Sequence, residues 1–347
     1  MKSLGLTRDA LVIGTAAAML AGCGGSQPPI GAPGAMAQTS ALATHADRGK
    51  SWMLLEAKRI ARHDRAGSWM SPAAKHESLL YVSDTRTKVY VYSYPKGDLV
   101  GTLTGFDGPL GECVDSKGDV WVVEYSSNDI VEYAHGGTQA IATLTTPVRS
   151  YGCSVDASSG NLAVAGSELA VYTDATGEPA TYSDSDFPEY TYCTYDGSGD
   201  LFADNVGQTL GIAELPSGSS QLKTITLNEN LGPGSMQWDG SYVAVEGSVV
   251  KYAAGGPLGP LQVYRVSVSG STGTIVGETL LKTNVDKNKF WGAQLWISGD
   301  VIVGVDSYRR PRSPAILSWR YPKGGLATRA IYPTSGFDTV LSPAPKT

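Results

Sequence analysis

The sequence predicts an all-β fold, a six-bladed β-propeller of four-stranded antiparallel blades, and three observations lead to this prediction. The 347 residues include 42 Gly, 19 Pro and 18 Tyr, a composition typical of strands joined by tight turns. Hydrophobic residues make up 41% of the chain, which is enough for a core of ordinary size. A segment pattern also recurs about every 40 residues.

The repeated unit begins with an apolar strand, an Asp/Gly turn and a second apolar strand, which is the pattern of a β-hairpin. Five copies align on turn glycines that lie 42, 39, 41 and 59 residues apart, namely Gly118, Gly160, Gly199, Gly240 and Gly299. A third strand, a second turn and a short fourth strand follow, as in residues 89–92, 94–97 and 99–103. Four strands in about 40 residues is the period of a propeller blade, and counting the units gives six.

Closure of the ring requires one more innermost strand in the first unit, and two segments compete for that position. Residues 336–341 resemble an innermost strand that follows the outer strand of the sixth unit at 327–332. Residues 68–71 are the alternative, since they directly precede the first unit. The sequence alone leaves both possibilities open.

The amino terminus has the pattern of an export signal. Lys2 and Arg8 precede an apolar stretch at residues 10–20, which is too short to span a bilayer. The following residues 20–23 (Leu-Ala-Gly-Cys) resemble the lipobox of bacterial lipoproteins, which implies cleavage after residue 22 and lipidation of Cys23. Ordinary secretion with a coincidental cysteine is the alternative. We therefore expect a signal peptide at 1–22, a lipidated flexible tether at 23–50, a strap at 51–78 and the propeller at 79–347.

The repeats resemble the NHL-repeat and gluconolactonase/regucalcin-like group of six-bladed propellers. The resemblance rests on an Asp-Gly turn followed by an apolar strand that ends in Asp, as in residues 199–204 and 80–84, and it covers roughly residues 79–341. Enzymes of this group hold a divalent metal at the mouth of the central channel with Glu, Asn and Asp side chains. The resemblance implies the fold more strongly than the activity, because one fold serves many functions.

Acidic or amide residues recur near the ends of the second strands, where the resemblance places a metal. They are Asp84, Glu124, Asp204, Asn205, Glu246 and Asp306, and the third unit departs from the pattern with Gly166. A hard cation such as Ca²⁺ binds six to eight oxygens, so these residues are candidate metal ligands. In the alternative interpretation each acid caps its own turn by accepting backbone N–H groups.

The sequence offers no obvious catalytic base or nucleophile, so we assign no catalytic residue and expect that the protein is not an enzyme. Of the four histidines, His45, His63 and His76 precede the ring, and His135 lies in an outer turn on the face opposite the second-strand ends. Streptogramin-lyase-like propellers use a histidine base that has no counterpart here. Nucleophile-elbow, zinc-protease and phosphate-loop motifs are also missing from the sequence.

Three cysteines lie 40 residues apart in successive innermost strands: Cys113, Cys153 and Cys193. We expect them to pack as small apolar residues between blades. The alternative is one disulfide between neighbouring blades, which an oxidising exported compartment permits. The spacing excludes CxxC redox and zinc chemistry.

Two irregular segments interrupt the repeat on the face where the second strands end. The fifth unit carries about 18 extra residues, including the Gly/Pro-rich segment 255–260. The sixth unit inserts Tyr308, Arg309, Arg310 and Arg312 after its second strand, and these are candidate ligands for an anionic or carboxylate group. A solvated loop with locally paired arginines is the alternative.

The combined expectation is an exported, lipid-anchored propeller that acts as a binding or interaction module in the cell envelope, facing the periplasm or the cell surface. With 27 basic and 33 acidic residues the net charge is −6, which argues against nucleic acid as a partner. We expect a monomer that contacts the membrane through its lipid alone and binds a protein or glycan on the loop face. The alternatives are a metal-dependent hydrolase of the gluconolactonase type, with Ca²⁺ as the possible cofactor, and a purely structural surface protein.

Overall fold

The computed structural model describes residues 67–204, 211–229, 231–249, 262–283, 294–306, 315–331 and 336–345. These residues all lie within the compact unit 40–347. The predicted signal peptide, Cys23, the tether, Asn205, residues 255–260 and Tyr308 to Arg312 lie outside the described residues.

The first sheet contains both ends of the described chain and has the strand order β1-β4-β3-β2-β26. Its elements are β1 (Trp69–Met70), the 3₁₀ turn η1 (Pro72–His76), β2 (Ser78–Ser83), β3 (Lys88–Tyr94), β4 (Leu99–Thr104) and β26 (Thr339–Ser342). β26 pairs antiparallel with β2, from Val82↔Thr339 to Leu79↔Ser342, and takes the innermost position. β1 pairs with β4 at the outer edge. The carboxyl-terminal segment is therefore the strand that closes the ring.

The second and third sheets are simple antiparallel meanders. The second consists of β5 (Pro109–Val114), β6 (Val120–Glu124), β7 (Asp129–Tyr133) and β8 (Ala140–Thr145). The third consists of β9 (Ser150–Val155), β10 (Leu162–Gly166), β11 (Leu169–Tyr172) and β12 (Ala180–Tyr182), with the 3₁₀ turn η2 (Thr173–Ala175) after β11. In each sheet the first strand in sequence lies innermost, as the repeat predicts.

Together with the short strand β24 (Gly325–Leu326), the next two meanders join into one nine-stranded sheet. They are β13 (Cys193–Tyr195), β14 (Leu201–Asp204), β15 (Ile212–Leu215) and β16 (Lys223–Leu227), then β17 (Leu231–Trp238), β18 (Val243–Val249), β19 (Gln262–Ser269) and β20 (Thr272–Lys282). The outer strands β16 and β20 pair in parallel through Thr226↔Thr272 and Leu227↔Gly273. This lateral pairing of two repeat units was not predicted from the sequence.

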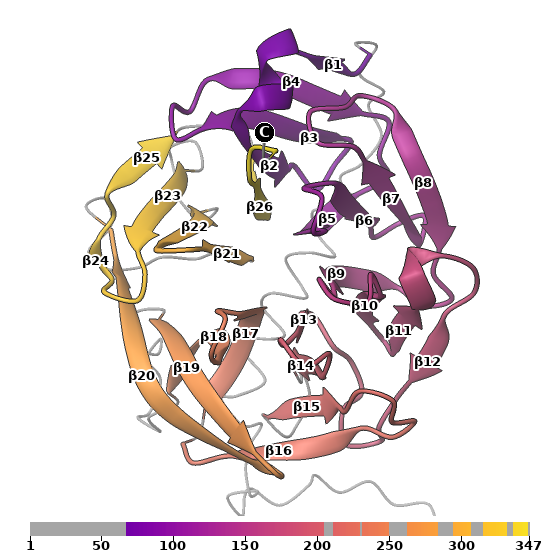
Figure 1. Cartoon of the computed structure of the whole chain (residues 1–347), viewed down its shortest axis with the longest axis vertical. Coiled ribbons are helices and arrows are strands. Elements are labelled where there is room, and N and C mark those ends of the chain that lie inside the picture. The colour runs from indigo at the N-terminus through magenta and orange to yellow at the C-terminus, as the bar shows by residue number, and fades with distance from the viewer. Residues whose placement is uncertain are drawn as a thin grey trace, which may run out of the picture. The chain divides into compact units, whose positions relative to one another are not determined.

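The last sheet has the order β21-β22-β23-β25 and follows the same plan. Its strands are β21 (Leu295–Ser298), β22 (Val301–Asp306), β23 (Ala315–Arg320) and β25 (Arg329–Ile331), while β24 (Gly325–Leu326) pairs with β20. Figure 1 shows the sheets around a common centre, a propeller-like arrangement with β5, β9, β13, β17, β21 and β26 nearest the centre. The apolar core lies between neighbouring sheets, as where Val122 and Val120 of β6 pack with Leu79 and Tyr81 of β2.

The turn that defines the repeat has the backbone conformation that its glycine predicts. All five aligned turn glycines have positive φ, from 58° at Gly299 to 96° at Gly240. Residues other than glycine rarely adopt a positive φ, so the recurrence of Gly follows from the turn geometry. The repeated Asp has an equally local role: Asp115 Oδ1 accepts the N–H groups of Lys117 and Asp119, both at 2.8 Å.

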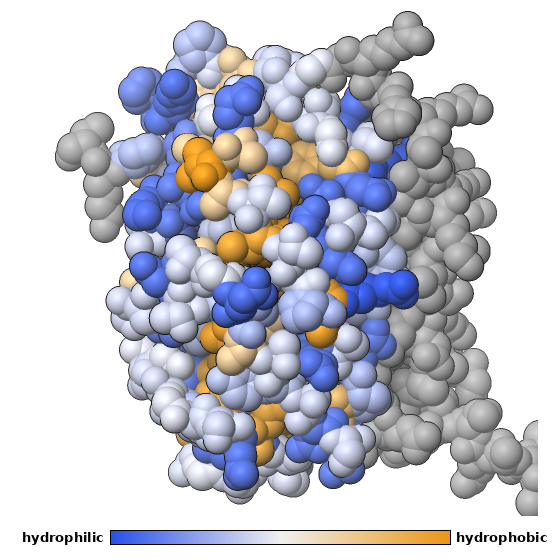
Figure 2. Space-filling view, turned by 90° about the vertical axis from the view of Figure 1, so that its right-hand side faces the viewer, coloured by the Kyte–Doolittle hydropathy of each residue, from blue (hydrophilic) through white to orange (hydrophobic). Residues whose placement is uncertain are grey.

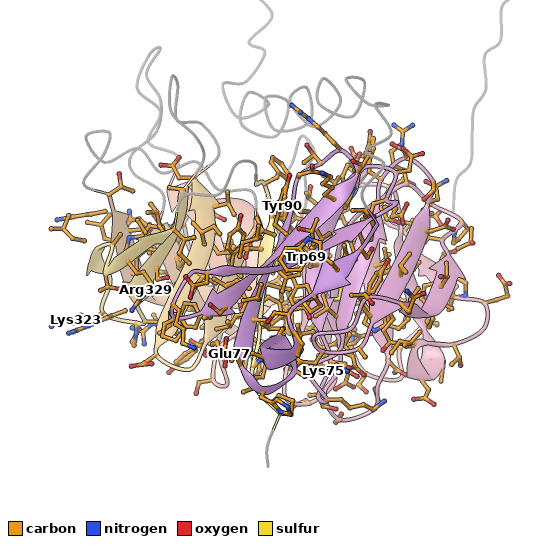
Figure 3. The ribbon with its side chains drawn as sticks, turned by 90° about the horizontal axis from the view of Figure 1, so that it is seen from above. Trp69, Lys75, Glu77, Tyr90, Lys323 and Arg329 are labelled. Carbon is orange, nitrogen blue, oxygen red and sulfur yellow. A yellow bond between two sulfur atoms is a disulfide. The ribbon has the colours of Figure 1, made fainter. Side chains whose placement is uncertain are left out.

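The ring has two ends, which Figure 3 shows from the side. The upper end is where the second strands finish, near Tyr90, and the lower end is where the repeated Asp/Gly turns lie, near Lys75 and Glu77. On the side of the ring that carries β8 and β12, apolar side chains lie in small groups among hydrophilic ones (Figure 2). No helix among the described residues is long and apolar enough to cross a membrane.

Neighbouring innermost strands are locked by a side chain two residues before the repeated turn. Ser154 Oγ of β9 accepts the Tyr195 N–H of β13 at 3.1 Å, and Thr194 Oγ1 accepts the Trp238 N–H of β17 at 2.9 Å. Gln237 of β17 likewise donates through Nε2 to Ile297 O of β21 at 3.0 Å. The ring is thus tied together near its centre by bonds between sheets.

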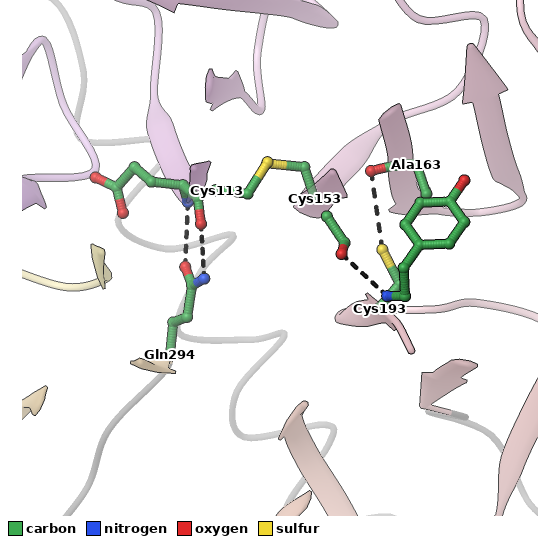
Figure 4. The surroundings of a disulfide bond; sticks show 8 residues. Cys113, Cys153, Ala163, Cys193 and Gln294 are labelled. Carbon is green, nitrogen blue, oxygen red and sulfur yellow. Dashed lines mark hydrogen bonds between the residues drawn. A yellow bond between two sulfur atoms is a disulfide. The ribbon is translucent and has the colours of Figure 1, made fainter. Parts of the chain in front are cut away.

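Cys113 occupies the same repeat position and forms a covalent bond instead. It is disulfide-bonded to Cys153 of the neighbouring sheet, with Cα atoms 5.6 Å apart (Figure 4). Cys193 is a free thiol and is buried. The packing expectation is therefore confirmed for Cys193 and wrong for the other two, for which the disulfide alternative holds. Counted from the turn aspartates Asp115 and Asp156, Cys113 is two residues upstream and Cys153 three, so equal spacing along the chain does not mean equivalent positions.

Candidate functional site

The acidic residues predicted at the second-strand ends all lie at the upper end and are buried. Asp84 follows β2, Glu124 ends β6 and Asp204 ends β14, while Glu246 lies within β18 and Asp306 ends β22. Their exposed fractions range from 1% to 8%. The repeat therefore places the described members of the predicted set at one end of the ring, and their hydrogen bonds show what each does there.

Asp84 and Glu124 hold the backbone of their own neighbourhood. Asp84 Oδ1 accepts the N–H groups of Arg86, Thr87 and Lys88 at 2.8, 3.0 and 3.0 Å. Glu124 Oε2 accepts the Asp107 N–H at 2.9 Å and the Ser127 hydroxyl at 3.0 Å. The contacts of Asp84 match the interpretation that each acid caps its own turn, whereas Glu124 also holds the β4–β5 connection through the Asp107 N–H.

Asp204 holds the segment that enters the innermost strand of the fourth meander. Its Oδ1 accepts the N–H groups of Thr191 and Tyr192 at 2.6 and 2.9 Å. Two buried backbone donors are satisfied by one carboxylate, so removing it would leave both unpaired. Asp204 therefore positions Tyr192 near the ring centre.

Three acids lie near the centre, and two of them, Glu112 and Asp338, were missed by the sequence prediction. We call Glu112 of β5, Glu246 of β18 and Asp338, which immediately precedes β26, the axial acids. Their exposed fractions are 0%, 4% and 1%. Glu246 Oε2 and Asp338 Oδ1 accept no hydrogen bond from any described residue. The repeated pattern of acids at second-strand ends does not include Glu112 and Asp338, because they lie in or before innermost strands.

Burial raises the pKa of each axial acid well above its ordinary value. For Asp338 burial is the cause, and for Glu246 and Glu112 the charge of Asp338 adds to burial. At Glu112 the neighbouring Ser83 acts in the opposite direction. Burial and then the nearby carboxylates also raise the pKa of the Tyr192 phenol well above its ordinary value. The centre of the ring therefore disfavours negative charge unless a cation compensates it.

The centre is bridged by Gln294, which precedes β21. Its Oε1 accepts the Glu112 N–H at 3.1 Å and its Nε2 donates to Glu112 O at 2.7 Å (Figure 4). β5 and β21 belong to sheets separated by the first sheet, whose innermost strand β26 packs against both. This buried pair of hydrogen bonds therefore crosses the ring near its axis and fastens non-adjacent sheets.

Within the described part of the chain, one set of three potential metal ligands has all its ligand atoms within 4.8 Å of one another. It consists of Asp115, Asp119 and Glu132, which lie in the second sheet at the lower end. The structure does not bring the described members of the predicted set together this closely. Since exposed acids often cluster without an ion, we assign no metal to this trio.

His135 lies at the lower end, as predicted, and fastens the closing strand. Its Nδ1 lies 2.6 Å from Ser342 Oγ of β26 and its Nε2 lies 3.0 Å from Glu77 O. Ser342 Oγ also bonds Gly118 O at 2.7 Å. Burial lowers the pKa of His135, although its backbone partners oppose this. The contacts give His135 a structural role at the ring closure.

No family model matches the chain, and no curated protein matches it. Solved structures do match. A chain of a nidogen/laminin complex shares 11% identity at a TM-score of 0.56, covering 78% of this chain and 100% of that one. A protein of unknown function from Bacteroides caccae shares 11% identity at a TM-score of 0.56, covering 77% of this chain and 99% of that one. Hydrazine synthase from Kuenenia stuttgartiensis shares 15% identity at a TM-score of 0.51, covering 74% of this chain and 79% of that one. At these identities the likeness concerns the fold alone, and with the topology above it establishes a β-propeller-like fold.

Proposed function

We propose that the chain is an exported, lipid-anchored, six-bladed β-propeller of the NHL-like type that acts as a binding module. The count of six treats β13–β16 and β17–β20 as separate blades, because each is an antiparallel meander and only two residue pairs join β16 to β20. Export rests on the signal and lipobox pattern that ends at Cys23. The Cys113–Cys153 bond fits this location, since oxidising compartments maintain disulfides.

The observation that carries the binding proposal is the fastened centre of the ring. Gln294 bonds Glu112 across the axis, and side-chain locks or the disulfide tie several neighbouring innermost strands together. A partner would then meet the rigid ring at its surface, where connecting loops tolerate sequence change. The nidogen/laminin structure provides a parallel, since that fold occurs there in a complex of proteins.

Photo-crosslinking in intact cells tests this proposal. A photoreactive residue is placed at Arg86 or Ser126, exposed positions in upper-end turns, and at Lys117 as a lower-end control. We expect a specific adduct from the upper-end positions alone. Adducts from Lys117 alone, or none beyond background at any position, would contradict a partner on the loop face. Cys23→Ala should release the chain from the membrane fraction, and unchanged sedimentation would count against lipidation.

A metal-dependent hydrolase is the second candidate, favoured by the axial acids. Buried carboxylate oxygens of Glu246 and Asp338 lack a hydrogen-bond donor among the described residues, and a divalent cation would supply the missing positive charge. Glu112 would contribute from the adjoining strand. The bound cation would polarise a carbonyl or activate water, while these residues would hold it.

Thermal melts in EDTA and then with Ca²⁺, Mg²⁺ or Zn²⁺ test the cation. A cation at 100 times its dissociation constant stabilises the folded state by about 2.7 kcal/mol. Asp338→Asn and Glu246→Gln should abolish that increase, whereas Asp84→Asn, which removes a turn cap, should lower both melts and preserve their difference. Identical melts of the wild type in EDTA and in each cation would reject the metal site.

A further inference from the structure

A cleft of about 280 Å³ lies between the β13–β16 and β17–β20 meanders. Its walls come from both meanders, and the parallel pairing of β16 with β20 joins them along the outer edge. The lining includes the β13–β14 turn and Gly270 of the β19–β20 turn, so the cleft lies at the lower end of the ring.

Carboxylates dominate the charge of this cleft. Asp196, Asp200 and Glu214 line it together with a single cationic side chain, Lys223. Three carboxylates against one ammonium leave a formal charge of −2 on the lining. Such a lining attracts a cation in preference to an anion.

Glu214 is the buried member of the set and has one unused oxygen. Its side chain is 5% exposed, and its Oε1 pairs with Lys223 Nζ at 2.7 Å. Its Oε2 accepts no hydrogen bond from any described residue. A buried carboxylate oxygen without a donor is costly, and the residue that carries it lines the cleft, so a donor that a ligand brings to Glu214 would remove this cost.

The remaining lining is apolar and aromatic. Val243 and Val266 form part of the wall on one side, and Phe202 on the other. The indole of Trp238 reaches across, because a Cβ built on Gly197 of the β13–β14 turn would lie 3.6 Å from Trp238 Nε1. Aliphatic and aromatic walls suit an organic stem, and an indole also attracts a cation placed over its ring.

A comparison with the second sheet shows which features are special to this cleft. Asp115, Asp119 and Glu132 there occupy the positions of Asp196, Asp200 and Glu214, since Glu132 pairs with Trp121 as Glu214 pairs with Phe202. The residue opposite Glu132 is Ala142, whereas the residue opposite Glu214 is Lys223. The fourth meander therefore places an alkylammonium group against the buried acid, so an ammonium is a partner that this acid already accepts.

We propose that this cleft binds a primary alkylammonium group, with the ammonium on Glu214 Oε2 and its apolar stem along Trp238 and Val266. Asp196 and Asp200 add attraction, although their Oδ1 atoms also hold backbone N–H groups of Ser198 and Ser217 at 2.7 Å. The ammonium belongs either to a free amine or to a lysine side chain. The two probes in the test below share a four-carbon stem and differ in the backbone amides that only the lysine derivative carries, so their relative affinity decides between these sources.

The test uses the full chain carrying Cys23→Ala, with ¹⁵N-labelled tryptophan. The Trp238 indole signal is assigned with Trp238→Phe and followed by NMR during titration. The probes are n-butylammonium as a free amine, Nα-acetyl-lysine methylamide as a lysine side chain, and 1-butanol as the uncharged isostere. We expect saturable shifts with at least one ammonium probe and none with 1-butanol, and the tighter probe identifies the source.

Two variants change the affinity in opposite directions, which separates recognition from damage to the fold. Glu214→Gln should weaken ammonium binding by about tenfold, because it removes a charge-assisted bond. Lys223→Met should strengthen it, because the competing internal ammonium is gone. Glu132→Gln, at the matching position in the second sheet, should leave the Trp238 titration unchanged. Four results would overturn the proposal. They are weaker binding in both cleft variants, a response to 1-butanol equal to that of the ammonium probes, a response to Ca²⁺ alone, and no shift with either ammonium probe.

Discussion

Removal of the disulfide gives the most direct test of how the ring is held together. Cys113 and Cys153 are 40 residues apart in sequence and join the innermost strands β5 and β9. The chain-entropy relation for a closed loop of this length gives a stabilisation of about 4 kcal/mol at 25 °C. For a domain of this size, about 4 kcal/mol corresponds to a fall of about 8 °C in melting temperature. Cys113→Ala with Cys153→Ala should therefore melt about 8 °C below the parent protein.

The assay combines a thiol count with a thermal melt of the full chain carrying Cys23→Ala. In denaturant without reductant, one thiol per chain should react, namely Cys193. Cys193→Ala is the matched control, because it deletes a buried thiol without breaking a crosslink and should lower the midpoint by less than the double variant. Three reactive thiols would show that the bond does not form. Equal melting of the double variant and the control would refute the argument from loop entropy.

Three further substitutions test particular contacts. Asp338→Asn should flatten the pH dependence of stability. The folded protein holds the Asp338 proton more tightly than the unfolded chain does, because burial raises the pKa of this carboxyl. The stabilisation from the bound proton is complete below about pH 3.9 and is lost as the pH rises through the raised pKa. Urea unfolding in EDTA from pH 4 to 8 would measure this, and an unchanged slope would contradict it. Gly111→Ala should cost about 1–3 kcal/mol, since its Cβ would lie 2.5 Å from Tyr151 O, whereas Gly67→Ala meets no atom within 4 Å and should be neutral by the same denaturation assay. His135→Ala should speed amide hydrogen exchange in β26, because it removes the contacts to Ser342 and Glu77, and protection equal to wild type would exclude this role.

The sequence predicted the plan of the sheets because the turns that create it are local. Gly118 has a positive φ and Asp115 accepts N–H groups of its own turn, so this pair of residues indicates a hairpin wherever it recurs. Which segment closes the ring was open, because both candidates are short apolar strands. The structure decides it through β26, whose Ser342 bonds Gly118 O and approaches His135, residues that are distant in sequence.

The site was harder to predict because its contacts join different repeats. Asp84 and Glu124 drew attention at strand ends, yet their carboxylates serve nearby backbone and side-chain donors. Glu112 and Asp338 lie near one another only after the ring closes. Gln294 likewise meets Glu112 across 182 positions of sequence. No local sequence pattern indicates contacts between residues so far apart in the chain. The sequence therefore predicted which end of the ring the acids occupy but not which residues meet at its centre.

Comparison of equivalent positions separates residues that build the repeat from residues that can give it a function. Two residues before the repeated turn, Ser154, Thr194 and Gln237 all lock to the next sheet, so that position is explained by the fold. Three residues before the turn, the chain has Cys153 and Cys193 but Glu112 in the second sheet. A buried acid gains nothing over cysteine as packing between sheets and carries a desolvation cost.

The same reasoning applies at the lower end, where Lys223 stands at the position that Ala142 fills in the second sheet. Glu214 and Glu132 recur at equivalent positions, so the acid alone does not distinguish the two units. The buried oxygen of Glu214 and the cleft beside it do distinguish them. In a repeat protein each unit supplies a control for the others. The departures at Glu112 and Lys223 are therefore better guides to function than the acids that recur in every turn, and substitutions at these two positions should affect ligand binding more than they affect the ring.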